Sequence, residues 1–159
     1  MSVAVSANFM KALRFLAQAQ DPRQAILDTV GPYLDDFDPL YGNVVLVAHY
    51  VEPEITGGLI IKPDETLLEQ LWQGKVGMML KAGEGAFRYR REFPYFATYP
   101  GEDETTTQAR WDEFTPKLGD WLFYKTSSTW AITVADRIIC RLVNDTEVMG
   151  KLKRPDILI

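Results

Sequence analysis

The chain contains one cysteine and one histidine among its 159 residues. Cys140 therefore has no intrachain disulfide partner, and in an apolar segment we expect it to behave as a small hydrophobic residue. His49 has no second histidine or cysteine at ligand spacing, so we expect it to be a satisfied or exposed strand residue. The chain also lacks a Gly-x-Ser-x-Gly turn and a phosphate-binding glycine loop. These absences predict a protein that is not an enzyme and holds no metal or cofactor.

Long apolar runs and basic runs are also missing. No apolar segment approaches the roughly 18–20 residues that a membrane span needs, and the first residues do not have the pattern of a secretory signal. The 17 Lys and Arg residues against 22 Asp and Glu give a net charge of -5, which disfavours binding to phosphate backbones. We expect a cytoplasmic protein that binds neither nucleic acid nor a membrane.

The apolar pattern of the chain changes near residue 43. Residues 1–42 predict a helical extension, with one helix from Ser6, a second from Pro22 capped by Asp21, and an acidic linker at 35–39. The remainder predicts an all-β domain over 43–159. Strands are expected at 43–51, 74–80, 117–124, 130–134, 138–143 and 147–152, with the strand at 130–134 returning from 117–124 as a hairpin.

The stretch from Glu54 to Asp64 contains Gly57 and Gly58, followed by Leu59, Ile60 and Ile61. Paired glycines allow a sharp turn, and the following proline discourages the three aliphatic residues from continuing as a central strand. We expect a loop over 52–73 that presents these aliphatic side chains to a partner. A short strand that enters the core after the turn is the alternative.

Three further apolar segments predict assembly contacts. The first is a short helix over 65–72 with one apolar face, and the second is an insertion at 86–115 whose aromatic residues predict a hairpin or paired strands. The third is the C-terminal segment, which we expect to pair with a sheet edge in the same molecule or a neighbour. The residues concerned are Leu67, Leu68, Leu71, Trp72, Phe93, Tyr95, Phe96, Ile157, Leu158 and Ile159.

Taken in order, the segments from residue 43 resemble the GroES co-chaperonin family. They are a first strand, a loop with Gly57-Gly58-Leu59-Ile60-Ile61, a Gly-Lys-Val strand from Gly74 that leads to Gly83-Glu84-Gly85, a Gly-Asp strand from Gly119, and a closing pair of strands. The resemblance implies a small GroES-like β-barrel, with the insertion at the position of the roof loop. It also implies a homo-oligomeric ring whose loops bind a GroEL-like chaperonin and assist protein folding. The resemblance includes the case in which the chain is a divergent family member encoded by a phage.

The apolar helix predicted at 65–72 departs from the family pattern, in which the loop is polar and mobile beside its tripeptide. A stiffened loop, the helical extension and the aromatic insertion suit permanent contacts. The alternative function is therefore a phage-type virion structural protein, such as a capsid decoration or head-tail component, that contacts capsid or tail proteins. In that case the protein is located in the virion.

Overall fold

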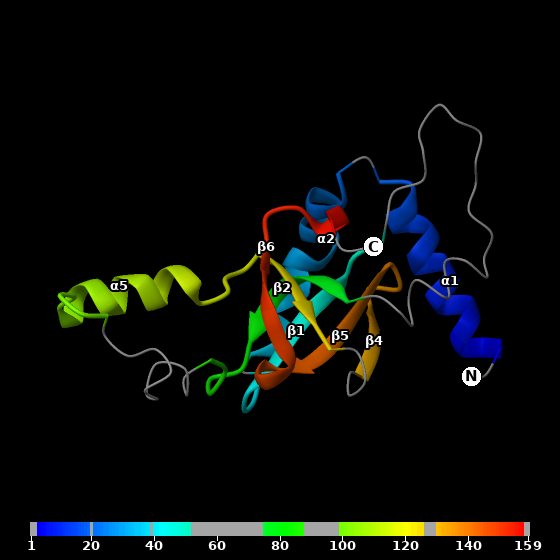
Figure 1. Ribbon diagram of the computed structural model, residues 1–159. Coiled ribbons are helices and arrows are strands. Elements are labelled where there is room, and N and C mark those ends of the chain that lie inside the picture. Colours follow the sequence, from blue (N-terminus) through cyan, green and yellow to red (C-terminus); the bar gives the residue numbers. More distant parts are fainter. Residues whose placement is uncertain are drawn as a thin grey trace.

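The computed structural model describes residues 3–19, 21–38, 40–51, 75–87, 99–125 and 130–157. In these ranges the chain forms an antiparallel sheet with helices on one side and a further helix, α5, that extends away from the sheet (Figure 1). The helices and strands are α1 Val3–Ala17, α2 Pro22–Val30, η1 Gly31–Phe37, β1 Val44–His49, β2 Val76–Ala82, α5 Glu104–Phe114, β3 Trp121–Tyr124, β4 Trp130–Val134, β5 Ile138–Asn144, η3 Asp145–Glu147, β6 Val148–Leu152 and η4 Pro155–Ile157, where η marks a 3-10 helix.

The sheet is open, so the expected closed barrel is wrong. Its six strands follow the order β4-β5-β1-β2-β3-β6, and all neighbours are antiparallel. Among the described strands, β4 and β6 each have a single neighbour. The expected hairpin between β3 and β4 is also wrong, because β4 pairs with β5 while β3 lies between β2 and β6. With its helices, the fold is mixed α/β rather than all-β.

The open sheet curls strongly. The three residues of η3 join β5 to β6, which lie four positions apart in the sheet. In a flat sheet that separation is about 19 Å, at about 4.8 Å per strand, whereas three residues of 3-10 helix advance about 6 Å. Curling brings together the apolar side chains on one face, which are Val45, Val47, Met79, Phe87, Leu122, Tyr124, Val143 and Val148.

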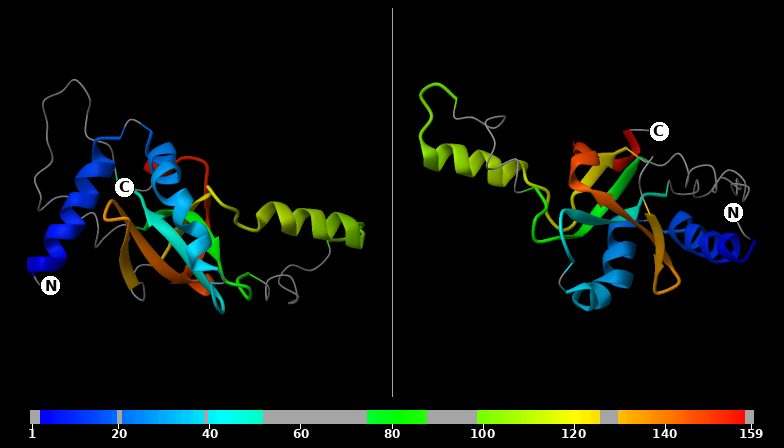
Figure 2. Two further views of the ribbon diagram at one scale, coloured as in Figure 1. Left: turned by 180° about the vertical axis from the view of Figure 1, so that it is seen from behind. Right: turned by 90° about the horizontal axis from the view of Figure 1, so that it is seen from below.

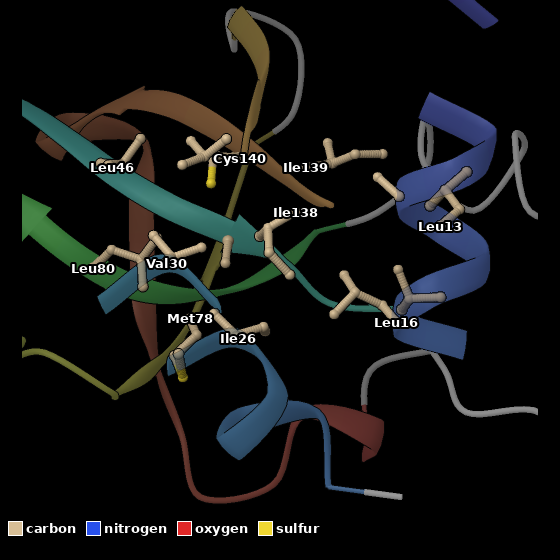
Figure 3. Close-up of a cluster of buried hydrophobic side chains, with 14 of the residues drawn as sticks. Leu13, Leu16, Ile26, Val30, Leu46, Met78, Leu80, Ile138, Ile139 and Cys140 are labelled. Atoms are coloured by element: carbon tan, nitrogen blue, oxygen red, sulfur yellow. The ribbon is translucent and has the colours of Figure 1, made fainter. Parts of the chain in front are cut away.

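The other face of the sheet is covered by α1 and α2. Leu13 and Leu16 of α1 and Ile26 and Val30 of α2 are fully buried. They pack with sheet residues that include Leu46, Met78, Leu80, Ile138, Ile139 and Cys140 (Figure 3). The N-terminal helices therefore share one hydrophobic core with the strands. Burial of Cys140 confirms its packing role and raises the pKa of its thiol to about 12.

The segment after α2 is helical as far as Phe37, so the expected linker at 35–39 is wrong over 35–37. The carboxylate of Asp21 accepts a hydrogen bond from the Gln24 backbone N–H at 3.3 Å and caps α2, as predicted. At its other end α2 runs directly into η1. Lys81 Nζ of β2 donates to the Leu34 carbonyl at 3.0 Å and lies 3.8 Å from Asp38 Oδ1. These contacts hold η1 against the sheet.

A helix, α5, occupies the last third of the insertion where a hairpin was expected, so that expectation is wrong over 104–114. The segment is rich in threonine, which is a weak helix former. Its start is fixed by a cap, because Asp103 Oδ1 accepts a hydrogen bond from the Thr106 backbone N–H at 2.7 Å. Local capping thus outweighs the β propensity of the threonines.

Candidate functional site

The segment 52–74 connects two adjacent strands at one end of the sheet. The Tyr50 N–H donates to the Val76 carbonyl at 3.0 Å, and the Tyr124 N–H donates to the Lys75 carbonyl at 2.9 Å. Val51 is only 1% exposed, and the ring of Tyr50 meets that of Trp121 edge-on, with centroids 5.4 Å apart. The residues at which the chain leaves β1 and enters β2 are therefore fixed by backbone hydrogen bonds and packing. We call them the first base of the sheet.

Most of the residues predicted to bind partners lie outside the described residues. These are Gly57, Gly58, Leu59, Ile60, Ile61, Leu67, Leu68, Leu71, Trp72, Phe93, Tyr95, Phe96, Leu158 and Ile159. The presented loop, its helix and the aromatic contacts therefore stay predictions. Ile157 is described, and it lies in η4 with 58% of its surface exposed.

A second base lies at the opposite end of the sheet, where β2 ends and β3 begins. The Gly83 N–H donates to the Val44 carbonyl at 2.8 Å, and the Gly119 N–H donates to the Met79 carbonyl at 2.9 Å. A Cβ at Gly83 would lie 2.3 Å from the Gly42 carbonyl oxygen, so only glycine fits there. Because β1, β2 and β3 are antiparallel neighbours, the connection from β1 to β2 and the connection from β2 to β3 start at opposite ends of the sheet.

The buried carboxylate of Asp145 holds the second base in place through hydrogen bonds. It is fully buried at the start of η3. Its Oδ2 accepts a hydrogen bond from the Phe87 backbone N–H at 2.8 Å, and its Oδ1 accepts one from Asn43 Nδ2 at 3.0 Å. Phe87 has a φ of 63°, in the left-handed region that non-glycine residues seldom adopt. The carboxylate thus joins the start of β1, the exit from β2 and the turn before β6.

A compact polar cluster joins α5 to the turn that precedes it. Arg110 donates from Nη2 to Glu102 Oε1 at 3.0 Å and from Nε to Oε2 at 3.2 Å, while its guanidinium carbon lies 3.9 Å from the centre of the Tyr99 ring. Thr107 Oγ1 donates to Glu102 Oε1 at 2.7 Å. The hydrogen bonds from Arg110, with a smaller contribution from Thr107, lower the pKa of Glu102 to about 2. Side chains of the preceding turn therefore brace α5, which extends from the sheet (Figure 2).

Exposed apolar residues lie at the end of α5, just after it and in β6, and a lysine ties the end of the helix to the sheet. Phe114 and Leu118 are 52% and 54% exposed, and Met149 of β6 is 50% exposed. Lys151 Nζ donates to the Glu113 carbonyl at 2.8 Å and lies 3.7 Å from Asp120 Oδ2. These contacts fix the root of α5 beside the β6 edge.

Three polar side chains lie on the curled face of the sheet, and sequence reasoning missed their proximity. His49, Tyr124 and Arg141 are 0%, 3% and 3% exposed, from β1, β3 and β5 respectively. Neither His49 nitrogen nor the Tyr124 hydroxyl has a hydrogen-bond partner. The expectation that His49 is either satisfied or exposed is therefore wrong. The sequence signal for this cluster is that each of the three strands has a polar residue at an inward-facing position.

Burial dominates the electrostatics of this cluster. It lowers the pKa of His49 to about 3, with a further lowering from the positive charge of Arg141. Burial also raises the pKa of the Tyr124 hydroxyl. A Cβ at Gly77 would lie 3.0 Å from that hydroxyl, so the Tyr124 side chain sits directly against the strand. The cluster is packed and sealed from solvent, and it offers a reactant no access.

The described residues form neither a metal-binding cluster nor a membrane-spanning helix. Within the described ranges, no three His, Cys, Asp or Glu side chains are grouped closely enough to hold a metal ion. In the same part of the chain, no helix combines the length and apolar character needed to cross a membrane.

Comparison with known proteins gives no family assignment. No protein-family model matches the chain, and no curated protein is significantly similar to it in sequence.

Proposed function

We propose that the protein is a non-enzymatic binding protein of the co-chaperonin type. It engages a GroEL-like chaperonin in the cytoplasm through Gly57, Gly58, Leu59, Ile60 and Ile61, with copies of the chain arranged as a homo-oligomer. The observation that supports this proposal best is the base of residues 52–74. The chain leaves and re-enters the sheet between adjacent strands that are joined by the Tyr50 to Val76 hydrogen bond of 3.0 Å. The proposal does not require a closed barrel.

The strength of such a contact depends on the number of copies that engage together. Burying three aliphatic side chains contributes roughly 5–8 kcal/mol, at about 1.5–3 kcal/mol each. Ordering a free loop costs roughly 1–2 kcal/mol per residue. A fixed base lowers that cost, because residues next to it are already ordered. Several linked copies then bind firmly while each single contact stays weak.

Capture by a chaperonin tests the proposal. The protein is immobilised and incubated with a GroEL-type chaperonin with and without ATP, and the retained chaperonin is measured. We expect nucleotide-dependent retention by the unmodified protein and loss of retention by Leu59→Ser and Ile60→Ser. Leu118→Ser is the matched control, because Leu118 is an aliphatic residue that is 54% exposed elsewhere on the molecule. Equal retention by all variants, or none by the unmodified protein, would contradict the proposal.

A virion structural protein is the second candidate, and α5 favours it. The helix extends from the sheet, is braced by the Arg110 to Glu102 ion pair and carries the exposed Phe114 near its root. A rigid arm with an apolar residue suits a permanent contact with capsid or tail proteins.

The two candidates separate in one comparison. Stable co-sedimentation with assembled capsids or tails, reduced by Phe114→Ser and unaffected by Leu59→Ser, would support the virion role. Nucleotide-dependent retention on chaperonin that is reduced by Leu59→Ser and unaffected by Phe114→Ser would support the co-chaperonin role.

A further inference from the structure

Within the part of the chain that the structure describes, strand β4 is an edge of the sheet, and its sequence has no charged residue or proline to discourage pairing. It hydrogen-bonds to β5 on one side, from Trp130 opposite Leu142 to Val134 opposite Ile138. Among the described strands it has no neighbour on the other side. The backbone groups on the outer side of an edge strand can therefore form hydrogen bonds with another strand.

The two edges of the sheet differ in the features that normally prevent such pairing. β6 contains Lys151, and its ladder with β3 is irregular between Phe123 and Tyr124. Charged residues and irregularities are common protections of edge strands. β4 has the sequence Trp-Ala-Ile-Thr-Val, with no charge, no proline and a regular register. An uncharged strand therefore pairs more favourably with the β4 edge than with the β6 edge.

One face of β4 and β5 is a continuous apolar row. Successive cross-strand pairs join Trp130 to Leu142, Ile132 to Cys140 and Val134 to Ile138. The row is buried at the Val134 end, which is 7% exposed, and open at the Trp130 end, which is 68% exposed. A monomer leaves this indole largely in water, although large aromatic side chains are effective anchors at interfaces.

We propose that β4 pairs in antiparallel orientation with β4 of a second copy, about a twofold axis at Ile132. In this register Trp130 lies opposite Val134 of the other copy, and Ile132 lies opposite its own counterpart. The apolar row then crosses the interface without a break, and each indole is covered by the partner sheet. The contact joins the two sheets into one and uses the same surface on both copies, so it closes as a dimer. It does not depend on the chaperonin or virion role.

The oligomeric state tests this interface. Sedimentation velocity of the full chain over a range of concentrations is expected to show a dimer. Trp130→Lys places a charge at each end of the shared row and is expected to weaken dimerisation at least tenfold. The exposed position of Trp130 keeps the fold intact, which circular dichroism checks. Leu118→Lys introduces the same charge at a similarly exposed residue and is expected to leave the dimer unchanged.

Crosslinking tests the register. Under oxidising conditions Ile132→Cys is expected to give a covalent dimer, because residues at the axis face each other. Thr133→Cys is expected to crosslink poorly, since the two copies of residue 133 are diagonal across the pair. Both variants also carry Cys140→Ala, because Cys140 lies directly opposite Ile132 on β5 and would otherwise pair with the introduced cysteine within one copy. A monomer at all concentrations, a dimer insensitive to Trp130→Lys, or equal crosslinking of both cysteine variants would overturn the proposal. If the protein forms the dimer but does not capture chaperonin, the result would contradict the proposed function and leave the dimer interface supported.

Discussion

The buried imidazole of His49 allows the curled face of the sheet to be tested directly. It is the single histidine of the chain, so its resonances can be assigned without ambiguity. Its pKa in the folded protein is lowered from 6.5 to about 3, first by burial and then by the charge of Arg141. At neutral pH the folded protein therefore holds a neutral, buried imidazole close to the positive charge of Arg141.

The sign of the resulting pH dependence follows from the lowered pKa. In the unfolded chain the imidazole takes up a proton as the pH falls below about 6.5, whereas in the folded protein it does so only near pH 3. The unfolded state thus binds more protons between these values, and stability falls as the pH falls through this window. At about 1.4 kcal/mol per unit, His49 is expected to remove about 2 kcal/mol between pH 7 and pH 5.

Two measurements check this expectation. The first is an NMR titration of the imidazole in the folded protein, which should show no protonation down to about pH 4. The second is urea unfolding of the unmodified protein and of His49→Phe at pH 7 and pH 5. The contributions of the carboxylates cancel in the comparison, so the variant should lose about 2 kcal/mol less than the unmodified protein. A titration near pH 6.5, or equal losses in both proteins, would refute the buried placement of His49.

Three further substitutions test other parts of the structure. Gly83→Ala should destabilise the fold by more than about 2 kcal/mol in urea unfolding, because its Cβ would meet the Gly42 carbonyl oxygen at 2.3 Å; Gly31→Ala, with open space around it, should be neutral and serves as the control. Tyr124→Phe should leave the midpoint of thermal unfolding unchanged or raise it, since the hydroxyl it removes is buried without a partner; a marked decrease would contradict that placement. Arg110→Ala should speed amide hydrogen exchange in α5 while exchange in the strands stays the same, and equal protection of α5 in both proteins would show that the polar cluster does not brace it.

The positions of the strands could be predicted from the sequence, but their partners could not. Apolar runs bounded by glycine, aspartate and asparagine marked all six strands close to their observed positions. Pairing depends on how the sheet curls, which no local pattern specifies. The turn after β5 joins strands four positions apart because Asp145 anchors it to Asn43 and Phe87. These contacts bridge 102 and 58 positions along the chain, and an expectation based on consecutive hairpins misses them.

Only the part of the candidate site that depends on residues adjacent in the sequence could be predicted. The paired glycines and the aliphatic triplet predict a binding segment, and this stays a prediction because its residues lie outside the described ranges. The burial of His49 beside Tyr124 and Arg141 depends on the inward register of three separate strands. The α5 arm was missed because its stability comes from the contacts of Glu102 with Arg110 and Thr107, which the helix itself creates. The hairpin was predicted from aromatic residues of the insertion that lie before the helix.

The central claim is that Leu59, Ile60 and Ile61 form the contact with a partner assembly. Its most direct test is the Kd for a GroEL-type chaperonin in the presence of ATP, measured for the unmodified protein, Leu59→Ser and the control Leu118→Ser. Loss of a buried leucine costs about 1.5–3 kcal/mol per copy, so Leu59→Ser should weaken binding at least tenfold while Leu118→Ser leaves it unchanged. Equal Kd values for all three proteins, or no measurable binding by the unmodified protein, would contradict the claim.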